Sequence, residues 1–232
     1  MKGKMDFLKL PETDETIPTI ICANMPHMAC LFLLDTSEAM SIDIIKSLNA
    51  GINGFKEAVC RDKITSNGLD VAIVEFNSNV RIVQDWCPVE YMKSVNLIAN
   101  GGTDIESGLR QAIDMVRERM HFYWEVIGAD TYKPWIIMIT AGNTKISMDG
   151  MGTEIADLDE KGKLNFMTLA VENADTSVLR ELCRDKRIFK LKGYDLSVFF
   201  SWVHSIINSA FHPPYFPPKS VLPDNVDMVV ND

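Results

Sequence analysis

The chain has 232 residues, of which 47% are hydrophobic and 24% charged, and its 23 basic against 32 acidic side chains give a formal net charge of −9. A chain of this length and composition can bury a substantial core, so we expect one large folded domain rather than two. The acidic balance argues against a nucleic-acid partner and against an anionic membrane surface, because both require clustered Lys and Arg.

The first predicted strand follows a polar N-terminal extension over residues 1–27, which three prolines interrupt. Residues 28–34 form a continuous apolar run that ends at Asp35, as expected of a strand buried on both faces. Residues 41–60 carry apolar side chains at helical spacing, which predicts an amphipathic helix in spite of two internal glycines.

A hairpin and the clearest helix are predicted next. The β-rich runs 69–76 and 80–86 flank Asn77-Ser78-Asn79, a short polar connection typical of a β-hairpin. Residues 104–124 place their apolar side chains on one stripe, which predicts a helix, and the apolar run 135–140 predicts another buried strand.

The second half of the sequence continues this alternation. The predicted elements are a strand over 164–171, a helix over 175–183, a strand over 187–191 and a closing amphipathic helix over 196–211. Asp157, Asp159 and Glu160 are interpreted as a solvated acidic face. Residues 212–232 contain half of the ten prolines and are expected to form an extended C-terminal tail.

Alternating strands and helices predict a doubly wound α/β domain over residues 28–211. We expect a six-stranded, mostly parallel sheet with one antiparallel strand from the hairpin and helices on both faces. In such sheets ligands bind beyond the carboxyl ends of the strands. The loops after Leu34, before Asp104 and after Ile139 are therefore the candidate site.

The cysteines and the N-terminus bear on the cellular compartment. Five cysteines are scattered along the sequence without C-x-x-C spacing, which indicates reduced thiols rather than a disulfide framework or a zinc ribbon. The N-terminal residues lack the apolar stretch of a signal peptide, and no segment approaches about 18 consecutive apolar residues. On these grounds the sequence predicts a cytoplasmic protein.

The three candidate loops carry a recognisable order of motifs. They are Asp35-Thr36-Ser37-Glu38-Ala39-Met40, Gly101-Gly102-Thr103-Asp104 and Thr140-Ala141-Gly142-Asn143. Together with the closing helix that begins near Asp195, this order resembles the von Willebrand factor type A (vWA) family over about residues 28–211. Within that family the chain looks most like the intracellular bacterial branch associated with tellurite-resistance operons (TerY-like).

The resemblance implies a metal-ion-dependent adhesion site (MIDAS), which usually holds Mg²⁺ and consists of D-x-S-x-S, a distant Thr and a distant Asp. Carried over by position, Asp35 is the first Asp, Ser37 the first Ser and Thr103 the Thr. Two positions depart from the pattern, because Ala39 stands where the second Ser belongs and Ala141 where the second Asp belongs.

These departures weaken the expected metal site. Mg²⁺ requires near-octahedral oxygen coordination and normally draws on one or two carboxylates, so we expect weak Mg²⁺ binding at most. Glu38, Asp104 and Asn143 are the alternative ligands, although nothing in their spacing demands that role. Without a cation, Asp35 is expected to accept hydrogen bonds from Ser37 and Thr103.

The leading hypothesis is a non-enzymatic vWA module that binds a protein partner through a loop rim at the carboxyl edge of the sheet. The expected rim residues are Glu38, Ala39, Gly102, Asp104, Ala141 and Asn143. By resemblance alone, the module would act in a stress or tellurite-resistance-type system.

Three alternatives remain open. Thr103-x-x-Glu106 reads as a capping box, which gives Thr103 a local structural role. A hydrolase or phosphoryl-transfer enzyme would use Asp35 as its nucleophile or base, although the sequence lacks G-x-S-x-G, a phosphate-binding loop and G-x-G-x-x-G. A scaffold subunit would act through the proline-rich tail instead of the rim.

Overall fold

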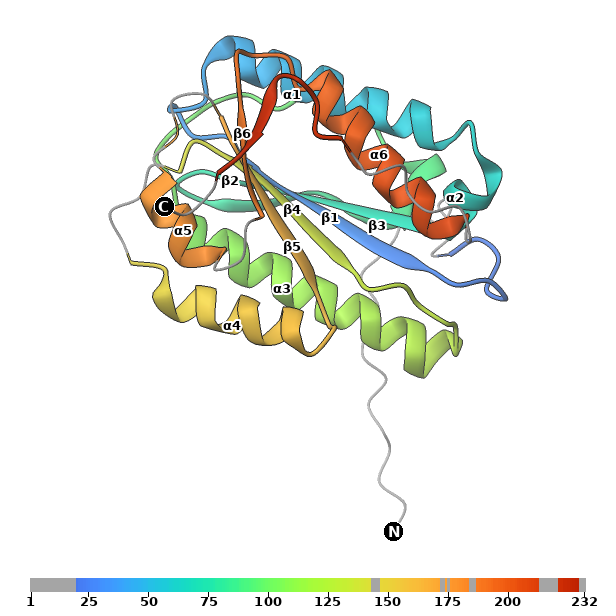
Figure 1. Cartoon of the computed structure of the whole chain (residues 1–232). Coiled ribbons are helices and arrows are strands. Elements are labelled where there is room, and N and C mark those ends of the chain that lie inside the picture. The colour runs from blue at the N-terminus through green and yellow to red at the C-terminus, as the bar shows by residue number, and fades with distance from the viewer. Residues whose placement is uncertain are drawn as a thin grey trace.

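The computed structural model describes residues 20–142, 147–171, 174, 176–183, 187–212 and 221–229. These residues form one twisted sheet with helices on both of its faces (Figure 1). The strands are β1 (Met28–Asp35), β2 (Leu69–Phe76), β3 (Val80–Pro88), β4 (Trp135–Thr140), β5 (Asn165–Ala170), β6 (Ile188–Leu191) and β7 (Val226–Met228). The expected α/β class is confirmed.

The sheet has the order β3-β2-β1-β4-β5-β6-β7. Strands β2, β1, β4, β5 and β6 are parallel, whereas β3 pairs antiparallel with β2 as the hairpin predicts. The expected strand number of six is wrong, because β7 adds an antiparallel edge beside β6. Part of the segment expected to be a tail therefore belongs to the sheet.

Six α-helices and two short helical turns connect the described strands. They are α1 (Ile42–Val59), α2 (Lys63–Gly68), the 3₁₀ turn η1 (Val89–Tyr91), α3 (Ile105–His121), the π-helical turn η2 (Phe122–Ile127), α4 (Asp149–Glu160), α5 (Thr176–Leu182) and α6 (Ser197–Phe211). Figure 1 shows α1 and α6 over one face of the sheet and α3, α4 and α5 over the other. Among the described residues, no helix has the length and apolarity needed to cross a bilayer.

The central strand β1 explains how two cores arise from one sheet. Cys30, Phe32 and Leu34 point toward α1 and α6, whereas Leu31 and Leu33 pack with the opposite helices. All eight residues of β1 are buried, as expected for a strand covered on both sides. Burial on both faces holds the carboxyl end of β1 in a fixed position within the sheet.

The structure adds two helices that the periodicity did not reveal. Helix α2 begins after Asp62, whose side chain accepts a hydrogen bond from the Ile64 amide. Helix α4 forms from a glycine-rich stretch, because it packs closely on α5: a Cβ at Gly152 would lie 1.9 Å from the carbonyl oxygen of Glu181. Tertiary packing thus overrides a weak local helix signal.

Candidate functional site

The carboxyl ends of β1, β2 and β4 meet at one edge of the sheet. Asp35 at the end of β1 is in register with Phe76 at the end of β2, and Leu34 is in register with Ile139 of β4. The loops after Leu34 and after Ile139 therefore lie side by side, as the sequence predicts. We give the name carboxyl rim to this edge together with the connection before α3, that is, to residues 35–40, 98–104 and 140–142.

Asp35 lies at the centre of the carboxyl rim and is fully buried. One carboxylate oxygen, Oδ1, accepts a hydrogen bond of 2.8 Å from the Ser37 amide. The other, Oδ2, accepts bonds of 2.7 Å from the Thr140 hydroxyl and 3.2 Å from the Ala141 amide. The carboxylate thus joins the β1 and β4 loops from inside the protein.

Backbone hydrogen bonds fix the connection before α3 against the same centre. The Asn100 amide donates to the Thr36 carbonyl at 2.7 Å, and the Glu38 amide donates to the Gly101 carbonyl at 3.0 Å. Gly101 has a φ of 71°, and a Cβ there would lie 2.8 Å from the Ser78 hydroxyl. This left-handed turn suits glycine and lets the connection lie directly against the hairpin loop.

Thr103 is not the capping residue of α3, in contrast to the capping box that the sequence suggested. The N-cap of α3 is Asp104, whose side chain accepts a 3.0 Å hydrogen bond from the Ser107 amide. Glu106 instead pairs with Arg110 on the exposed side of the helix. The predicted capping box is therefore wrong by one residue, because the Asp104 carboxylate accepts from the Ser107 amide and satisfies one of the free amides at the helix end.

The expected hydrogen bonds to Asp35 are also corrected. Its donors are two backbone amides and Thr140, rather than the hydroxyls of Ser37 and Thr103. The Ser37 hydroxyl is buried and has no hydrogen-bond partner among the described residues. Thr140 is the site residue that sequence reasoning missed. Its position directly after the apolar run of β4 was the available signal.

These contacts test whether the residues suit a divalent cation. Asp35 contributes the one carboxylate at the centre, and both of its oxygens already bond to protein donors. Ala39 and Ala141 contribute no side-chain oxygen, and the buried Ser37 hydroxyl has no partner among the described residues. In the described ranges no cluster of three or more His, Cys, Asp or Glu side chains could hold a metal. The donor set does not fit octahedral Mg²⁺.

The outer surface of the rim is partly as expected. Glu38, Ala39 and Gly102 are exposed, and Asp104 is half-buried. Ala141 is buried, so it offers no contact area to a partner. Asn143 lies outside the described residues.

Two large apolar side chains extend this outer surface. Ile42, at the start of α1, is 71% exposed, and Ile98 is 72% exposed. Ile98 lies between Leu97, which bonds to Asn49 of α1, and Asn100, which bonds to Thr36. Ile42 and Ile98 therefore belong to the segments that follow the Asp35 loop and precede the Asn100 contact with Thr36, and each offers apolar contact area to another molecule.

A buried polar cluster occupies the opposite, amino edge of the sheet. Asp70 at the start of β2 accepts a bond of 2.9 Å from Arg119 and one of 2.5 Å from the Tyr123 hydroxyl. The His27 ring stacks on Tyr123, and its Nδ1 lies 3.5 Å from Asp70. Burial, followed by the charge of Asp70, raises the pKa of Tyr123 well above its usual range. The cluster joins α3 to the sheet.

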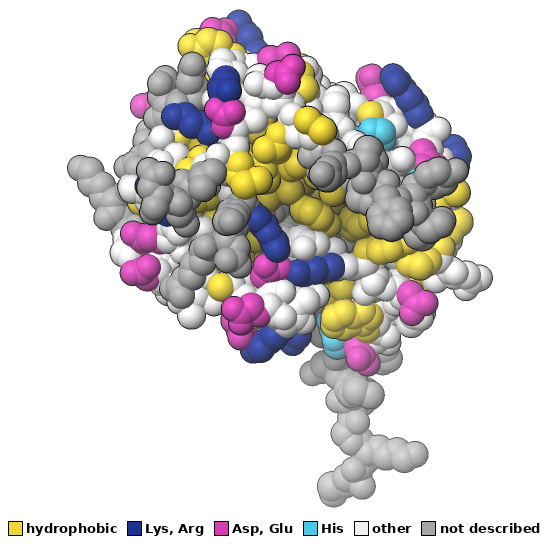
Figure 2. Space-filling view, in the orientation of Figure 1, with side chains coloured by type: hydrophobic (Ala, Val, Ile, Leu, Met, Phe, Trp, Pro, Cys, Tyr) yellow, Lys and Arg dark blue, Asp and Glu magenta, His cyan; other side chains and the backbone are white. Residues whose placement is uncertain are grey.

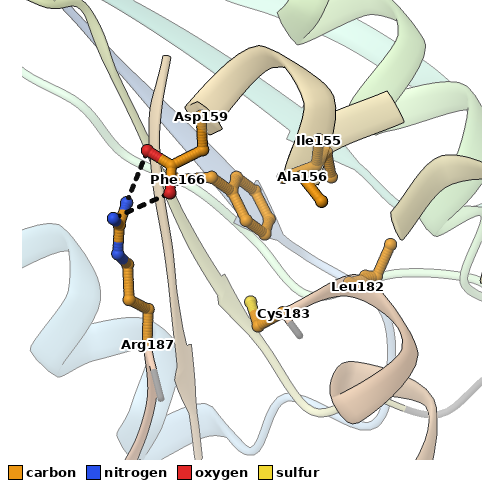
Figure 3. Close-up of a pocket in the computed structure, with 7 residues that line it drawn as sticks. All are labelled: Ile155, Ala156, Asp159, Phe166, Leu182, Cys183 and Arg187. Atoms are coloured by element: carbon orange, nitrogen blue, oxygen red, sulfur yellow. Dashed lines mark hydrogen bonds and ion pairs between the residues drawn. The ribbon is translucent and has the colours of Figure 1, made fainter. Parts of the chain in front are cut away.

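A small cavity lies between α4 and α5 (Figure 3). Its volume is about 30 Å³, the share of roughly one water molecule. Asp159 closes one side through two contacts to Arg187, as the dashed lines in Figure 3 show, and it also pairs with Lys133. Burial alone would raise the pKa of Asp159, but these two cations lower it. The interpretation of Asp159 as a solvated acid is therefore wrong.

The face that carries α6 shows a third feature. Figure 2, in the orientation of Figure 1, shows hydrophobic side chains gathered between charged groups on the side of the molecule turned toward the reader. A shallow depression beneath α6 is lined by Trp135, Met167, Val203 and Ile206, among others. It has no room for a ligand, because α6 packs directly on β4 and β5 at this point.

A family model described as the von Willebrand factor type A domain matches residues 30–200. No curated protein matches the sequence.

Solved structures show the same fold. The pilus adhesin SpaC from Lactobacillus rhamnosus GG, in an open conformation, has a TM-score of 0.65 and 13% identity over 81% of this chain and 31% of that chain. The vWF domain of the type V pili tip protein Mfa5 from Porphyromonas gingivalis has a TM-score of 0.59 and 11% identity, over 83% of this chain and 98% of that chain.

A third structure is proximal thread matrix protein 1 from the mussel byssus with a zinc-occupied MIDAS motif. Its TM-score is 0.52 and its identity 20%, over 81% of this chain and 46% of that chain. The chain thus spans about a third to a half of the adhesin and of the byssus protein. At these identities the likeness concerns the fold.

Proposed function

Because the chain belongs to the von Willebrand factor type A family, we propose that it is a non-enzymatic module that binds a protein partner through its carboxyl rim. Domains of this family often mediate protein–protein interaction, and two of the similar structures are a pilus adhesin and a pilus tip protein. The exposed residues of the carboxyl rim indicate what kind of surface this partner presents.

The proposal rests on one observation: the carboxyl rim combines a rigid, buried centre at Asp35 with exposed apolar side chains on its outer surface. Asp35 is buried and satisfied, so the loops around it are preorganised rather than held by a ligand. Ile42 and Ile98 project beside this centre, together with the exposed carboxylate of Glu38. An apolar contact with a charged neighbour suits a partner that presents an apolar side chain next to Lys or Arg.

We propose that recognition at this rim does not depend on Mg²⁺. In a MIDAS the metal connects the domain to its partner, and here Ala39 and Ala141 remove two of the expected oxygen ligands. Thr140 supplies a hydrogen bond to the carboxylate that a cation would otherwise neutralise. Shape and apolar burial then replace metal coordination as the source of affinity.

The cellular setting is a finer part of the proposal. We place the protein in the cytoplasm of a bacterium, in the TerY-like branch, with a role in a stress or tellurite-resistance-type system. The five cysteines are free, and three of them are buried, as is typical of a reducing compartment. Increased tellurite sensitivity after deletion of the gene, reversed by the wild-type copy, would support this assignment, and unchanged sensitivity would contradict it.

Two alternatives make different predictions. A hydrolase or phosphoryl-transfer enzyme needs Asp35 at the surface, whereas this carboxylate is 0% exposed and bonds to three donors. A scaffold that acts through its tail would need residues 213–220, which lie outside the described residues. An equal-length Gly/Ser replacement of 213–220 tests the scaffold, since it keeps β7 in the sheet.

The direct test compares two matched surface substitutions in affinity capture with quantitative mass spectrometry. Ile98→Asp places a charge on the carboxyl rim, and Ile64→Asp places one on α2, next to the amino edge. Both side chains are exposed, so neither change should unfold the domain. We expect Ile98→Asp to lose a protein that wild type and Ile64→Asp retain, in chelator as well as in Mg²⁺.

Two outcomes would contradict the proposal. If Ile98→Asp retains every protein that wild type captures, the rim is not the contact surface. If capture requires Mg²⁺ and disappears in chelator, the rim works through a metal after all.

A further inference from the structure

An open cavity separates α3 from α4 on the face of the sheet opposite α1 and α6. Figure 1 shows these two helices side by side on that face. Ile113, Val116 and Met120 form one wall on α3, and Leu158 near the end of α4 faces them. Leu164, just before β5, completes the apolar lining. This α3–α4 cavity lies toward the amino edge of the sheet, away from the carboxyl rim.

The size of the cavity limits what it can hold. Its volume is about 200 Å³. Apolar protein cavities of about 150 Å³ hold a benzene-sized molecule, so this space suits a ligand of about six to ten carbon atoms. Its lining side chains Ile113, Val116, Met120 and Leu164 are already buried, which means that the cavity is a recess between the helices rather than a flat apolar patch. An alkyl chain or a ring fits it better than a second protein surface does.

The mouth of the cavity carries positive charge only. Arg117 and Lys163 are its two charged lining residues. Arg117 is compensated by Asp114 at 2.8 Å and by Glu154 at 3.5 Å. In the described part of the chain no acidic side chain pairs with the exposed Lys163 ammonium. The protein as a whole has a net charge of −9, so a cation without an acidic partner among the described residues stands out. Beside an apolar cavity, such a cation favours an anionic ligand.

Trp124 gives the mouth a fixed aromatic wall. It is 52% exposed, yet its indole N–H donates a 3.1 Å hydrogen bond to the Thr131 hydroxyl. The ring is therefore held in place although half of it faces solvent. A rigid, half-exposed indole adds apolar contact at little entropic cost when a ligand enters.

We propose that the α3–α4 cavity binds a small amphipathic monocarboxylate, with its alkyl chain between α3 and α4 and its carboxylate on Lys163. The apolar walls account for the chain, the single unpaired ammonium accounts for one negative charge, and Trp124 covers the part of the ligand nearest to solvent. This site is separate from the carboxyl rim, and it does not depend on how the rim recognises a partner.

Octanoate titrated into the full chain tests the proposal. We expect saturable binding in isothermal titration calorimetry with a Kd of about 0.1 mM, the affinity of a ligand of about ten non-hydrogen atoms at ordinary efficiency. Tryptophan fluorescence should change in parallel, and the change should disappear in Trp124→Phe. Octylamine, which has the same chain and the opposite charge, should bind at least tenfold more weakly.

Three variants locate the ligand. Lys163→Glu should weaken octanoate binding at least tenfold. Lys161→Glu changes the net charge equally, two residues away, but Lys161 pairs with Asp157 and does not line the cavity, so binding should be unchanged. Leu158→Trp fills the cavity from a half-buried position and should abolish binding while the protein stays folded by circular dichroism.

Each contrary result overturns the proposal. Equal binding of octylamine, or equal loss in Lys163→Glu and Lys161→Glu, would mean that Lys163 does not select the ligand. Retained binding in Leu158→Trp would place octanoate elsewhere. Absence of saturable octanoate binding would overturn the proposal outright.

Discussion

The Thr140 hydroxyl donates a 2.7 Å hydrogen bond to Asp35 across 105 positions of sequence. Its own oxygen accepts a 2.9 Å bond from the Gly142 amide, so one side chain connects the end of β1 to the turn after β4. A fully buried carboxylate is costly unless donors surround it. Thr140 therefore stabilises the loops of the carboxyl rim in the position that a metal would otherwise hold.

The first prediction concerns this pair. Thr140→Val should lower the free energy of unfolding by about 1–3 kcal/mol, because it removes a donor to a buried carboxylate at constant side-chain shape. Thr168→Val is the matched control: Thr168 is also buried in a strand, but among the described residues its hydroxyl contacts only the Cys183 sulfur, at 3.5 Å. Urea denaturation at neutral pH measures both. Equal losses would mean that the Asp35 contact is unimportant.

The second prediction restores the missing ligands. Ala39→Ser with Ala141→Asp should melt below wild type in chelator, because two adjacent carboxylates repel each other in a buried site. Millimolar Mg²⁺ should raise the melting temperature of this double variant by roughly 5 °C, since binding to the folded state alone stabilises it. Wild type should not respond. A wild-type melting temperature that rises with Mg²⁺ would contradict the metal-independent rim.

Much of this fold follows from residue patterns, and the misses have physical causes. The apolar run ending at Asp35 and the stripe along α3 identify buried elements because burial is periodic in strands and helices. Helix α4 was missed because its glycines lower local helix propensity, and packing against α5 overrides that penalty. Strand β7 was missed because its three residues follow a proline-rich segment and pair only over a long sequence distance.

The candidate site, too, could be predicted from the sequence in part. The order of Asp35, Ser37 and Thr103 indicated which loops meet, because strand ends in parallel sheets share an edge. The sequence could not show that Thr140 and two amides would complete the Asp35 shell, since side-chain direction at a strand end depends on the exact turn. Nor could it show the Asp70 cluster, whose members are spread over about half of the chain.

The third prediction tests that buried cluster. Arg119→Met should lower the free energy of unfolding by about 3–5 kcal/mol, because Asp70 would remain buried beside Tyr123 without its cation. Replacing both charges, as Arg119→Met with Asp70→Leu, should cost less than the sum of the two single changes. A double-mutant cycle in urea measures this coupling. Simple additivity would show that the two charges act independently.

The fourth prediction compares two acids on α4. Asp159→Asn weakens contacts with both Lys133 and Arg187, and the Asp159 side chain is 19% exposed. We expect it to cost about 1–3 kcal/mol, as for a partly buried charged hydrogen-bond group. Asp157→Asn breaks a pair whose acid is 54% exposed and should cost under about 1 kcal/mol. Thermal melts of both variants measure the two losses of stability. Similar losses would mean that the ion pair between Asp159 of α4 and Arg187, next to β6, does not stabilise the fold.

The fifth prediction concerns alkaline pH. Burial raises the pKa of Cys87 to about 12, with the charge of Asp70 adding to the effect, and burial raises the pKa of Cys183 to about 11. In the unfolded chain these thiols have the ordinary cysteine pKa of about 9.0 and release their protons near that pH. Above that pH the unfolded state binds fewer protons than the folded state, so the free energy of unfolding must fall as pH rises. Each retained proton contributes a slope of about 1.4 kcal/mol per pH unit.

Urea denaturation between about pH 8 and about pH 10.5 should show this decline, and variants assign it. Cys183→Ala should make the slope shallower by up to about 1.4 kcal/mol per pH unit, whatever it does to stability at neutral pH. Cys22→Ser, which replaces an exposed cysteine, is the control for removing a thiol. If Cys183→Ala keeps the wild-type slope, the thiol is not shielded from water in the folded state. The packing of α5 against β5 around it would then be looser than the hydrogen bond between Thr168 and Cys183 indicates.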